Sequence, residues 1–529
     1  MSRGRFPGMD LGSRAAALLA VCAASLIPLA ELRGQDTPSV PDTLAAAAPR
    51  AEDAASPPLP VDHWAARAAM RAQALGLTRE FLPAQRAVPR SAVARALREA
   101  AEAARTASPD VAALAAGWHL RFTEEFREFG ARPARVGGVL GGAVAVEADE
   151  WSGRVRPASG MYDYRVNPGA IRDRAAASVG AAPAVGWKHV YATADAWAGT
   201  EEVDVRSWEV GAQAGRWNVS VGEEPVGYGY GRGGGVVLSG AAPFPRAQIQ
   251  TTRPFRLPGV LKAVGSTSFH TMLTRLDEER NPGKPWFWSA RMAFEPHQRF
   301  TVGISRASVF GGDHITTPVT FGNVARMFVG ILSKDFENQV VAVDARWRLP
   351  TDGAVPLTAY LEWGSEDASG AWWNVPGRVV GIMAPALPGA PQVAAGVEVT
   401  HFAPPCCGNP PWYFSGAQSG DWVYRELPMG HPLGGEGWEA TVYGQADLLD
   451  ARLRVDGRTF LRRRGDEGFR TVLRAGNLYA PLRTGRSLGG AVDAALRLTP
   501  KTELRTHLRV EDGGDWREHQ LRVSAAYLF

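Results

Sequence analysis

The chain has 529 residues, and its 58 lysines and arginines nearly balance its 54 aspartates and glutamates, for a formal net charge of +4. This balance argues against a nucleic-acid partner, whose binding surface would be one-sidedly basic. After about the first thirty residues no uninterrupted apolar run approaches the ~20 residues that a membrane helix requires, which excludes a helical membrane protein. A soluble protein or a membrane β-barrel remains. The 59 glycines and 17 tryptophans favour the barrel, in which tryptophan anchors at the lipid interface.

The first 34 residues have the features of an export signal. Three arginines among the first 14 residues precede or open an apolar stretch at residues 15–30 that is too short to span a membrane. We therefore expect residues 1–34 to be removed on export, which leaves Cys406 and Cys407 as the remaining cysteines. Two adjacent cysteines cannot hold a small disulfide scaffold together, so the fold must be stabilised by other means.

Two segments of different composition follow the signal. Residues 35–60 are rich in proline, alanine and acidic residues without periodicity, which predicts a disordered linker. Residues 61–131 are rich in alanine and arginine and have helical spacing of apolar residues. Ser108 and Pro109 provide a cap and a first-turn proline, and Gly76 is suited to end a helix. About three short helices are expected, which form a small periplasmic helical region or a cap at the mouth of a barrel.

From residue 132 to the carboxy-terminus the sequence alternates with a period of two. Residues 341–349 place apolar side chains on one face and mainly aspartate and arginine on the other, and residues 504–511 alternate in the same way. Residues 521–529 end the chain as a membrane strand that stops on a terminal phenylalanine. Hydrocarbon offers no water to backbone groups, so a spanning sheet must close on itself. We therefore predict an all-β fold, a transmembrane antiparallel barrel over residues 132–529, with room for roughly 16 to 18 strands.

In such a barrel the polar residues of each strand face the lumen. Mixed charge there suits either a water-filled pore or an interior filled by protein and held by ion pairs, and composition leaves both open. The charged residues expected in the lumen are Asp344, Arg346, Arg348, Asp493, Arg497, Arg505, His507, Arg509 and Glu511.

Residues 225–246 interrupt the alternation and are expected to form a loop. A phosphate cradle would require a helix after the glycines, and residues 236–238 show no helical continuation. Glycine also allows a backbone to fold tightly inside a barrel lumen, so we expect an inward plug. The plug glycines are Gly227, Gly229, Gly231, Gly233 and Gly234.

Short motifs occur across most of the mature chain: GYG at 229–231, VVLS at 236–239, APFPR at 242–246, FEPH at 294–297, GISR at 303–306, FGG at 310–312 and GHPLG at 430–434. Together they resemble the Wzi family of outer-membrane capsule-assembly proteins. The most specific of them lie in the glycine-rich segment, and the helical region at residues 71–100 also resembles that of the family.

The resemblance implies a barrel of about 18 strands with helices on the periplasmic side and an occluded lumen. It also implies a non-enzymatic, lectin-like protein of the cell outer membrane that binds and organises capsular or other surface polysaccharide without a cofactor. Outer-membrane lipid and the barrel-assembly machinery are the other expected partners. The helical region further resembles a single surface-layer-homology repeat, a module that binds cell-wall polymers, but it lacks the usual triplication.

Aromatic residues of the outer loops are candidates for holding sugars. Sugar C–H faces stack on aromatic rings, and arginine binds hydroxyls or carboxylates. Tryptophan and tyrosine equally mark the interfacial girdle of a barrel, so each residue has two interpretations. The candidates for polysaccharide binding are Trp372, Trp373, Trp412, Tyr413, Trp422 and Arg425.

The segment HFAPPCCGNPPWYF at residues 401–414 contains both remaining cysteines. His401 with Cys406 and Cys407 would supply at most three zinc ligands in a strained arrangement, so no metal site is expected. In an oxidising compartment the pair is expected to form a strained vicinal disulfide or to stay as free thiols.

Two other functions remain open on the sequence. A passive porin would use the same charged lumen to select solutes and would show steady open-channel current. An outer-membrane hydrolase would need a nucleophile, a base and an orienting acid, and the ten histidines carry no local catalytic signature. Because a triad assembles in space, only a test for cleavage of lipid or glycan settles this point. We expect no catalytic residues.

Overall fold

The computed structural model describes most of the chain between Ala55 and Phe529, and residues 1–54, the predicted signal included, lie outside the description. The described residues are 55–61, 63–126, 134–151, 175–199, 203–276, 282–328, 336–351, 355–366, 376–402, 412–413, 422–424, 427–465, 485–514 and 516–529.

Three α-helices and one short 3-10 turn form a block before the first strand, as the composition predicted. They are α2 (Trp64–Ala74), α3 (Arg90–Ala103), η4 (Ala104–Thr106) and α4 (Pro109–Glu125). Pro109 occupies the first turn of α4 after Ser108, and Gly76 has a φ of 79° just after α2. The helices share a core around the buried Leu97 and Trp118. In the described part of the chain, no helix has the length and apolar character needed to cross a membrane.

The end of the segment that we expected to be disordered is packed instead. Ala55 and Leu59 are buried, and their N–H groups donate to Lys188 O at 3.0 Å and Val88 O at 2.8 Å. The prediction of a disordered linker is therefore wrong for residues 55–60, because backbone groups there make hydrogen bonds that a disordered segment would lack. The rest of the predicted linker lies outside the described residues.

The remaining described residues form mainly β-strands. In chain order the strands are β1 (Ala134–Trp151), β2 (Ala175–Trp187), β3 (Val190–Gly199), β4 (Val203–Ala214), β5 (Trp217–Gly227), β6 (Ser239–Thr251), β7 (Phe255–Arg256), β8 (Ser266–Arg275), β9 (Trp286–His297), β10 (Phe300–Phe310), β11 (Glu337–Arg348), β12 (Thr358–Glu366), β13 (Gly377–Ala384), β14 (Val393–Phe402), β15 (Val423–Tyr424), β16 (Leu427–Pro428), β17 (Gly437–Leu448), β18 (Leu453–Arg464), β19 (Gly485–Thr499), β20 (Thr502–Gly513) and β21 (Trp516–Leu528). Two further short helices, η6 (Gly259–Val264) and α5 (Phe321–Phe328), lie in connections between strands.

The sheet closes into a barrel because its last strand pairs with its first. All the described pairings of the wall are antiparallel, and β1 pairs with β21 from Val139↔Leu528 to Trp151↔Trp516. The described sheet has 19 strands, of which β7 is a two-residue piece beside β8. This leaves the closed 18-stranded wall that was predicted.

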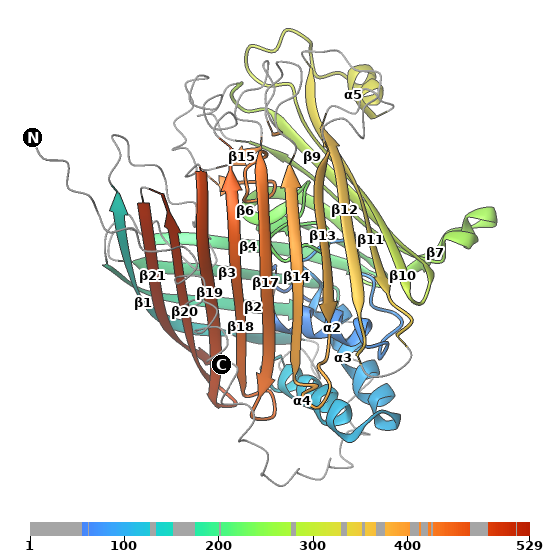
Figure 1. Ribbon diagram of the computed structural model, residues 1–529. Helices are drawn as coiled ribbons and strands as arrows, with labels where there is room; N and C mark the ends of the chain where they lie inside the picture. The colour runs from blue at the N-terminus through green and yellow to red at the C-terminus, as the bar shows by residue number, and fades with distance from the viewer. Residues whose placement is uncertain are drawn as a thin grey trace, which may run out of the picture.

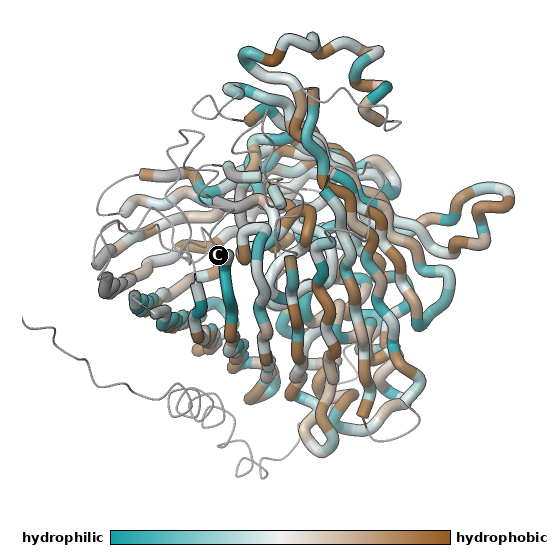
Figure 2. Tube along the Cα trace, turned by 45° about the horizontal axis from the view of Figure 1, so that its top comes forward, coloured by the Kyte–Doolittle hydropathy of each residue, from teal (hydrophilic) through white to brown (hydrophobic). Residues whose placement is uncertain are grey.

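The two-residue alternation separates a lipid face from an interior, as a membrane barrel requires. In β21, Leu521 and Val523 are 43% and 40% exposed, whereas Arg522 between them is 7% exposed. In β5, Val219 is exposed and the neighbouring Ser220 is buried. Figure 2 shows the same alternation of apolar and polar positions along the wall. The apolar carboxy-terminal face predicted from the sequence is therefore confirmed.

The two ends of the barrel differ in the length of their connections. One end, which we call the short-connection end, has two-residue turns between strands at residues 188–189, 215–216 and 298–299. The other end, which we call the long-connection end, has much longer connections, which include residues 311–336 and 403–436. Figure 1 shows α2 to α4 in blue toward the end opposite α5.

Ion pairs attach the helical block to the short-connection end. Arg71 donates to Asp447 Oδ2 at 2.9 Å and to Pro385 O at 2.5 Å, both at that end. Arg121 donates to Glu503 Oε2 at 2.9 Å, so α2 and α4 are both bonded to the wall.

Candidate functional site

The glycine-rich connection between β5 and β6 folds into the barrel. This segment, residues 228–238, is called the inner loop. Tyr228, Val236, Val237 and Leu238 are completely buried in it. They share one core with interior residues of β8 to β14. A loop of this length at a barrel rim would ordinarily lie in water, so its burial marks a specific structural role.

Two buried carboxylates of the wall hold the backbone of the inner loop. Glu398 of β14 accepts from Arg232 N at 2.6 Å and from Gly233 N at 2.9 Å. Glu362 of β12 accepts from Val236 N at 2.8 Å. These hydrogen bonds satisfy backbone N–H groups that the fold removes from water. The loop is therefore bonded to two separate strands of the wall.

Glycine is needed in the inner loop at specific positions. Gly229 and Gly234 have φ angles of 75° and 142°, which side chains rarely adopt. A Cβ on Gly229 would lie 2.2 Å from Glu362 Oε2, and one on Gly231 would lie 2.4 Å from Gly234 O. A side chain at Gly229 or Gly231 would therefore collide with a neighbouring atom, so the path of the inner loop depends on glycine.

Side chains of the inner loop also bond to the interior. Tyr228 Oη lies 2.8 Å from His270 Nδ1 and 2.9 Å from Ser289 Oγ, and burial raises its pKa. Arg232 Nη2 donates to Asp456 Oδ1 at 3.1 Å. The loop is thus fixed by side chains on β8, β9 and β18 as well as by its backbone.

The charged residues predicted for the lumen lie in the interior or line its cavity. Asp344 is buried and accepts from Arg291 Nη2 at 2.7 Å, and Arg509 donates to Glu511 at 3.1 Å. His507 Nδ1 lies 2.7 Å from Asp493 Oδ1. The remaining members of the predicted set contact other interior groups: Arg346 lies over Tyr230, Arg348 lies beside Gly76, Arg497 pairs with Glu124 and Arg505 pairs with Glu503.

The aromatic candidates Trp412, Tyr413 and Trp422 are buried, with exposures of 3%, 9% and 1%. Tyr413 Oη donates to Val236 O at 2.5 Å and Trp422 Nε1 donates to Val237 O at 3.0 Å. We expected these three rings to be exposed for stacking, and that expectation is wrong. All three share the buried core of the inner loop, and Tyr413 and Trp422 also donate to its carbonyls. Their role in holding sugar stays a prediction.

The other candidates, Trp372, Trp373 and Arg425, lie outside the described residues, as do Cys406 and Cys407.

A buried histidine completes the cover of the inner loop. His431 N donates to Tyr413 Oη at 3.1 Å, and Leu433 N donates to His431 Nδ1 at 3.1 Å. Burial lowers the pKa of His431 to about 4, so the ring is neutral at neutral pH. Burial also raises the pKa of Tyr413, which keeps its hydroxyl a donor. This turn is the GHPLG motif of the sequence, whose contact with the glycine-rich segment the sequence did not reveal.

The residues that sequence reasoning missed are the carboxylates that hold the inner loop. Glu362 and Glu398 occupy inward positions of alternating strands, and Glu366 accepts from Tyr413 N at 2.7 Å. Glutamates at inward positions are expected in any barrel with a polar interior, so these residues did not stand out in the sequence. The only signal was that they lie at inward positions of the two-residue alternation.

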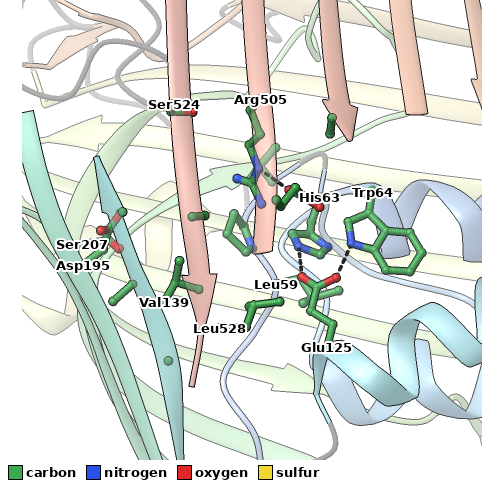
Figure 3. Close-up of a pocket in the computed structure, with 18 of the residues that line it drawn as sticks. Leu59, His63, Trp64, Glu125, Val139, Asp195, Ser207, Arg505, Ser524 and Leu528 are labelled. Carbon is green, nitrogen blue, oxygen red and sulfur yellow. Dashed lines mark hydrogen bonds and ion pairs between the residues drawn. The ribbon is translucent and has the colours of Figure 1, made fainter. Parts of the chain in front are cut away.

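A cavity of about 500 Å³ lies between the helical block and the wall formed by β1 to β4 and β18 to β21. Figure 3 shows His63, Trp64 and Glu125 on one side of it and Asp195 and Arg505 among the residues of the other walls. Glu125 Oε2 accepts from Trp64 Nε1 at 2.8 Å, and its Oε1 lies 3.5 Å from His63 Nε2. Burial lowers the pKa of His63.

The charges around this cavity are paired with one another. Arg206 Nε lies 3.4 Å from Asp195 Oδ2, and Arg454 Nη2 lies 2.6 Å from Asp456 Oδ2. The Arg206 guanidinium also covers the Trp197 ring at 4.0 Å. Such a lining suits water, because its charges are already neutralised locally and its tryptophan face is occupied. No group of three or more metal-binding side chains occurs among the described residues.

Comparisons with known proteins agree with this architecture. The sequence profile described as capsule assembly protein Wzi matches residues 141–514. A solved structure from Escherichia coli, described as Wzi, an outer membrane protein involved in group 1 capsule assembly and a carbohydrate binding β-barrel, has a TM-score of 0.66 at 15% identity. The match covers 90% of this chain and 99% of that one.

Other solved structures match with lower TM-scores. OprD of Pseudomonas aeruginosa has a TM-score of 0.44 at 9% identity, with 75% of this chain and 95% of that chain covered. No curated protein sequence matches the chain.

Proposed function

The chain belongs to the family of capsule assembly protein Wzi, and from this premise we propose that it is an outer-membrane barrel that holds surface polysaccharide at its long-connection end. The proposed role is non-enzymatic and uses no cofactor. The related barrel of Escherichia coli is described as carbohydrate binding, which supports capsular polysaccharide as the ligand class. Outer-membrane lipid and the barrel-assembly machinery are partners that any such barrel requires.

The observation that carries the proposal is the closed interior below the long-connection end. Arg232 and Gly233 bond to one wall strand, Val236 bonds to another, and Trp422 donates to Val237 O of the same loop. We infer that the inner loop is a plug. A plugged barrel cannot pass solutes, so its exposed surface, rather than its lumen, is the part available to a polymer.

We propose that the short-connection end and the helical block face the periplasm. Bacterial outer-membrane barrels have short periplasmic turns and longer outer loops. The chain enters the barrel from the helical block, and its carboxy-terminus at Phe529 lies at the same end, where Phe529 N donates to Gly138 O. This orientation directs residues 311–336 and 403–436 outward, where a capsule would be.

Within the outer connections we propose two roles for the aromatic candidates. Trp372, Trp373 and Arg425 belong to the outer connections and are proposed to contact the glycan by stacking and by charge-assisted hydrogen bonds. Trp412 and Trp422 are proposed to support that surface from below, since their rings are already packed.

The test is glycan affinity of a folded variant. In the combined variant Trp372→Ala, Trp373→Ala and Arg425→Ala, affinity for capsular polysaccharide from the producing strain should fall at least about tenfold. Isothermal titration in detergent measures the affinity, and the mobility of unheated protein on gels reports the folded barrel. The matched control is Trp208→Ala, which removes an exposed tryptophan of β4 and should leave affinity unchanged. Unchanged affinity in the triple variant would reject the assignment of these loops.

A further inference from the structure

The connection between β6 and β8 projects from the barrel at its short-connection end. It contains β7 and the short 3-10 helix η6, and Figure 1 shows it extending away from the wall beside the label β7. At its tip Val260 is 90% exposed and Leu261 is 51% exposed. Figure 2 shows apolar positions toward the same tip. Adjacent, highly exposed aliphatic side chains on a projecting turn indicate that the tip contacts an apolar phase or partner.

The same connection is basic throughout. Residues 252–265 contain Arg253, Arg256 and Lys262 and no acidic residue. Arg256 and Lys262 are both exposed, on either side of the aliphatic tip. A short amphipathic segment with aliphatic residues at its tip and cations around them has the composition of an interfacial membrane anchor.

An aromatic cluster connects this segment with the lipid face of the wall. Trp217, the first residue of β5, has its ring centroid 5.7 Å from that of Phe255 and 6.3 Å from that of Phe269. Beyond Trp217 the outward positions of β5 continue with the exposed Val219 and Val221. Tryptophan and phenylalanine at the end of an apolar belt mark the level of the membrane interface.

The neighbouring turn adds a further cation at this level. Arg216 lies in the two-residue turn between β4 and β5, and its guanidinium is 5.8 Å from the centroid of the Phe255 ring. Its carbonyl accepts from Thr252 N at 2.8 Å, so the turn and the connection are held together. The cations thus lie beside the aromatic cluster, where phospholipid headgroups would be.

We propose that residues 253–264, called the basic foot, lie in the inner leaflet of the outer membrane and bind anionic phospholipid. Val260 and Leu261 insert below the headgroups, while Arg256 and Lys262 contact lipid phosphates. The foot rests on the proposed function for the orientation of the barrel, because only the inner leaflet meets the short-connection end. Each cation near an anionic lipid surface contributes a roughly fivefold preference for that lipid.

Spin labelling of the full chain in lipid tests the foot. The variant Val260→Cys, in a background with Cys406→Ser and Cys407→Ser, is labelled and placed in bilayers of phosphatidylcholine with phosphatidylglycerol. We expect the label to be accessible to oxygen and protected from a water-soluble nickel chelate, like a label at the lipid-facing Val219. A label at Lys501, in an exposed turn of the same end, gives the water reference. Nickel accessibility at position 260 equal to that at position 501 overturns the proposal.

Charge variants test the lipid class. The pair Arg256→Glu and Lys262→Glu should raise nickel accessibility at position 260, whereas Arg256→Lys with Lys262→Arg should not. Lys188→Glu, an exposed cation in another turn of the same end, is the matched control and should have no effect. If accessibility in pure phosphatidylcholine equals that with phosphatidylglycerol, anionic recognition is refuted.

A second measurement covers the case in which the serine background does not fold. The unlabelled chain with its native cysteines should unfold at a higher temperature in phosphatidylglycerol than in phosphatidylcholine bilayers. The Arg256→Glu and Lys262→Glu pair should lose that difference, and its persistence in the variant contradicts the proposal. Glycan affinity of the same variant should equal that of the unmodified chain. If glycan affinity is lost only in the Trp372→Ala, Trp373→Ala and Arg425→Ala variant, glycan binding and lipid binding by the foot are shown to be separate.

Discussion

The inner loop and the helical block both bury wall carboxylates, but they satisfy them differently. At the inner loop, Glu362 and Glu398 accept from neutral backbone N–H groups. At the helical block, Asp447 and Glu503 accept from the guanidinium groups of α2 and α4. The inner loop is therefore held through backbone N–H groups, whose positions require glycine, whereas the helical block is held by ion pairs. Removing one partner should be most costly where both partners are charged, because a buried charge is then left unpaired.

The largest effect is expected from Arg71→Ala in the helical block. Asp447 would lose a buried ion pair at 2.9 Å, and the unfolding free energy should fall by about 3 kcal/mol or more. Burial lowers the pKa of Arg71 to about 10, so the group is still charged at neutral pH. Urea unfolding of the refolded barrel measures the change. The double variant with Asp447→Asn should recover part of the loss, and equal loss in both would show that charge matching is unimportant there.

A pH effect of similar or smaller size is expected at the cover of the inner loop. The folded pKa of His431, about 4, lies below the ordinary value of about 6.5. Between these values the unfolded chain binds a proton that the folded chain does not, so stability is lost as pH falls from about 6.5 to about 4. This window corresponds to roughly 3 kcal/mol, and stability above it should not change through this group.

The variant His431→Asn isolates this contribution. Its amide oxygen can still accept from Leu433 N, and it does not titrate. Unfolding free energies measured from pH 7 to pH 4 should fall less steeply in this variant than in the native chain. Parallel curves for the two chains would contradict the assignment.

A moderate loss of stability with a qualitative change in conduction is expected from Glu398→Ala. Two loop N–H groups would lose their acceptor, at a cost of about 1–3 kcal/mol. The native barrel should be silent in planar bilayers, and the variant should show channel openings because the plug is released. Deletion of residues 227–235 should open it permanently. Glu503→Ala is the control: it disturbs the helical block but should leave the barrel silent. Steady current through the native barrel would instead support the porin.

The smallest effect is expected from Trp422→Phe. A smaller aromatic ring remains, and the hydrogen bond of the indole to Val237 O is lost; the lost bond alone should cost about 0.5–1.5 kcal/mol. Trp208→Phe on the lipid face has no such bond in the described contacts and should be close to neutral. Thermal unfolding of the two variants side by side measures the difference. Equal shifts in the two variants would contradict a contribution from the hydrogen bond to Val237 O.

The sequence was sufficient for the wall because strand alternation is a local property. The apolar positions 521 and 523 and the polar position 522 lie as their period of two requires. The helices followed from composition and from boundary residues: Ser108 occupies the N-cap position of α4, although its side chain makes no capping hydrogen bond, and Pro109 lies in the first turn. Residues 55–60 were misjudged because proline-rich composition predicts disorder only when nothing nearby accepts the segment's hydrogen bonds.

The site was less predictable because its contacts join residues that are far apart in the chain. Tyr413 reaches the inner loop across 177 positions, and Trp422 does so across 185. Composition alone suggests that a tryptophan in an outer loop has an exposed ring. In the structure these rings donate to carbonyls of the inner loop and pack against its apolar side chains. The position of Glu398 under the loop likewise depends on how the barrel closes, which no short motif encodes.

The pairing of β1 with β21 has a consequence for assembly. The helices and the inner loop precede most of the wall in the chain, yet the finished cylinder surrounds the loop. Twelve strands of the described sheet, β8 to β14 and β17 to β21, follow the loop in the chain and complete the cylinder around it. A chain truncated before residue 516 would lack β21, so β1 and β20 would each keep an unpaired edge and the cylinder could not close around the loop.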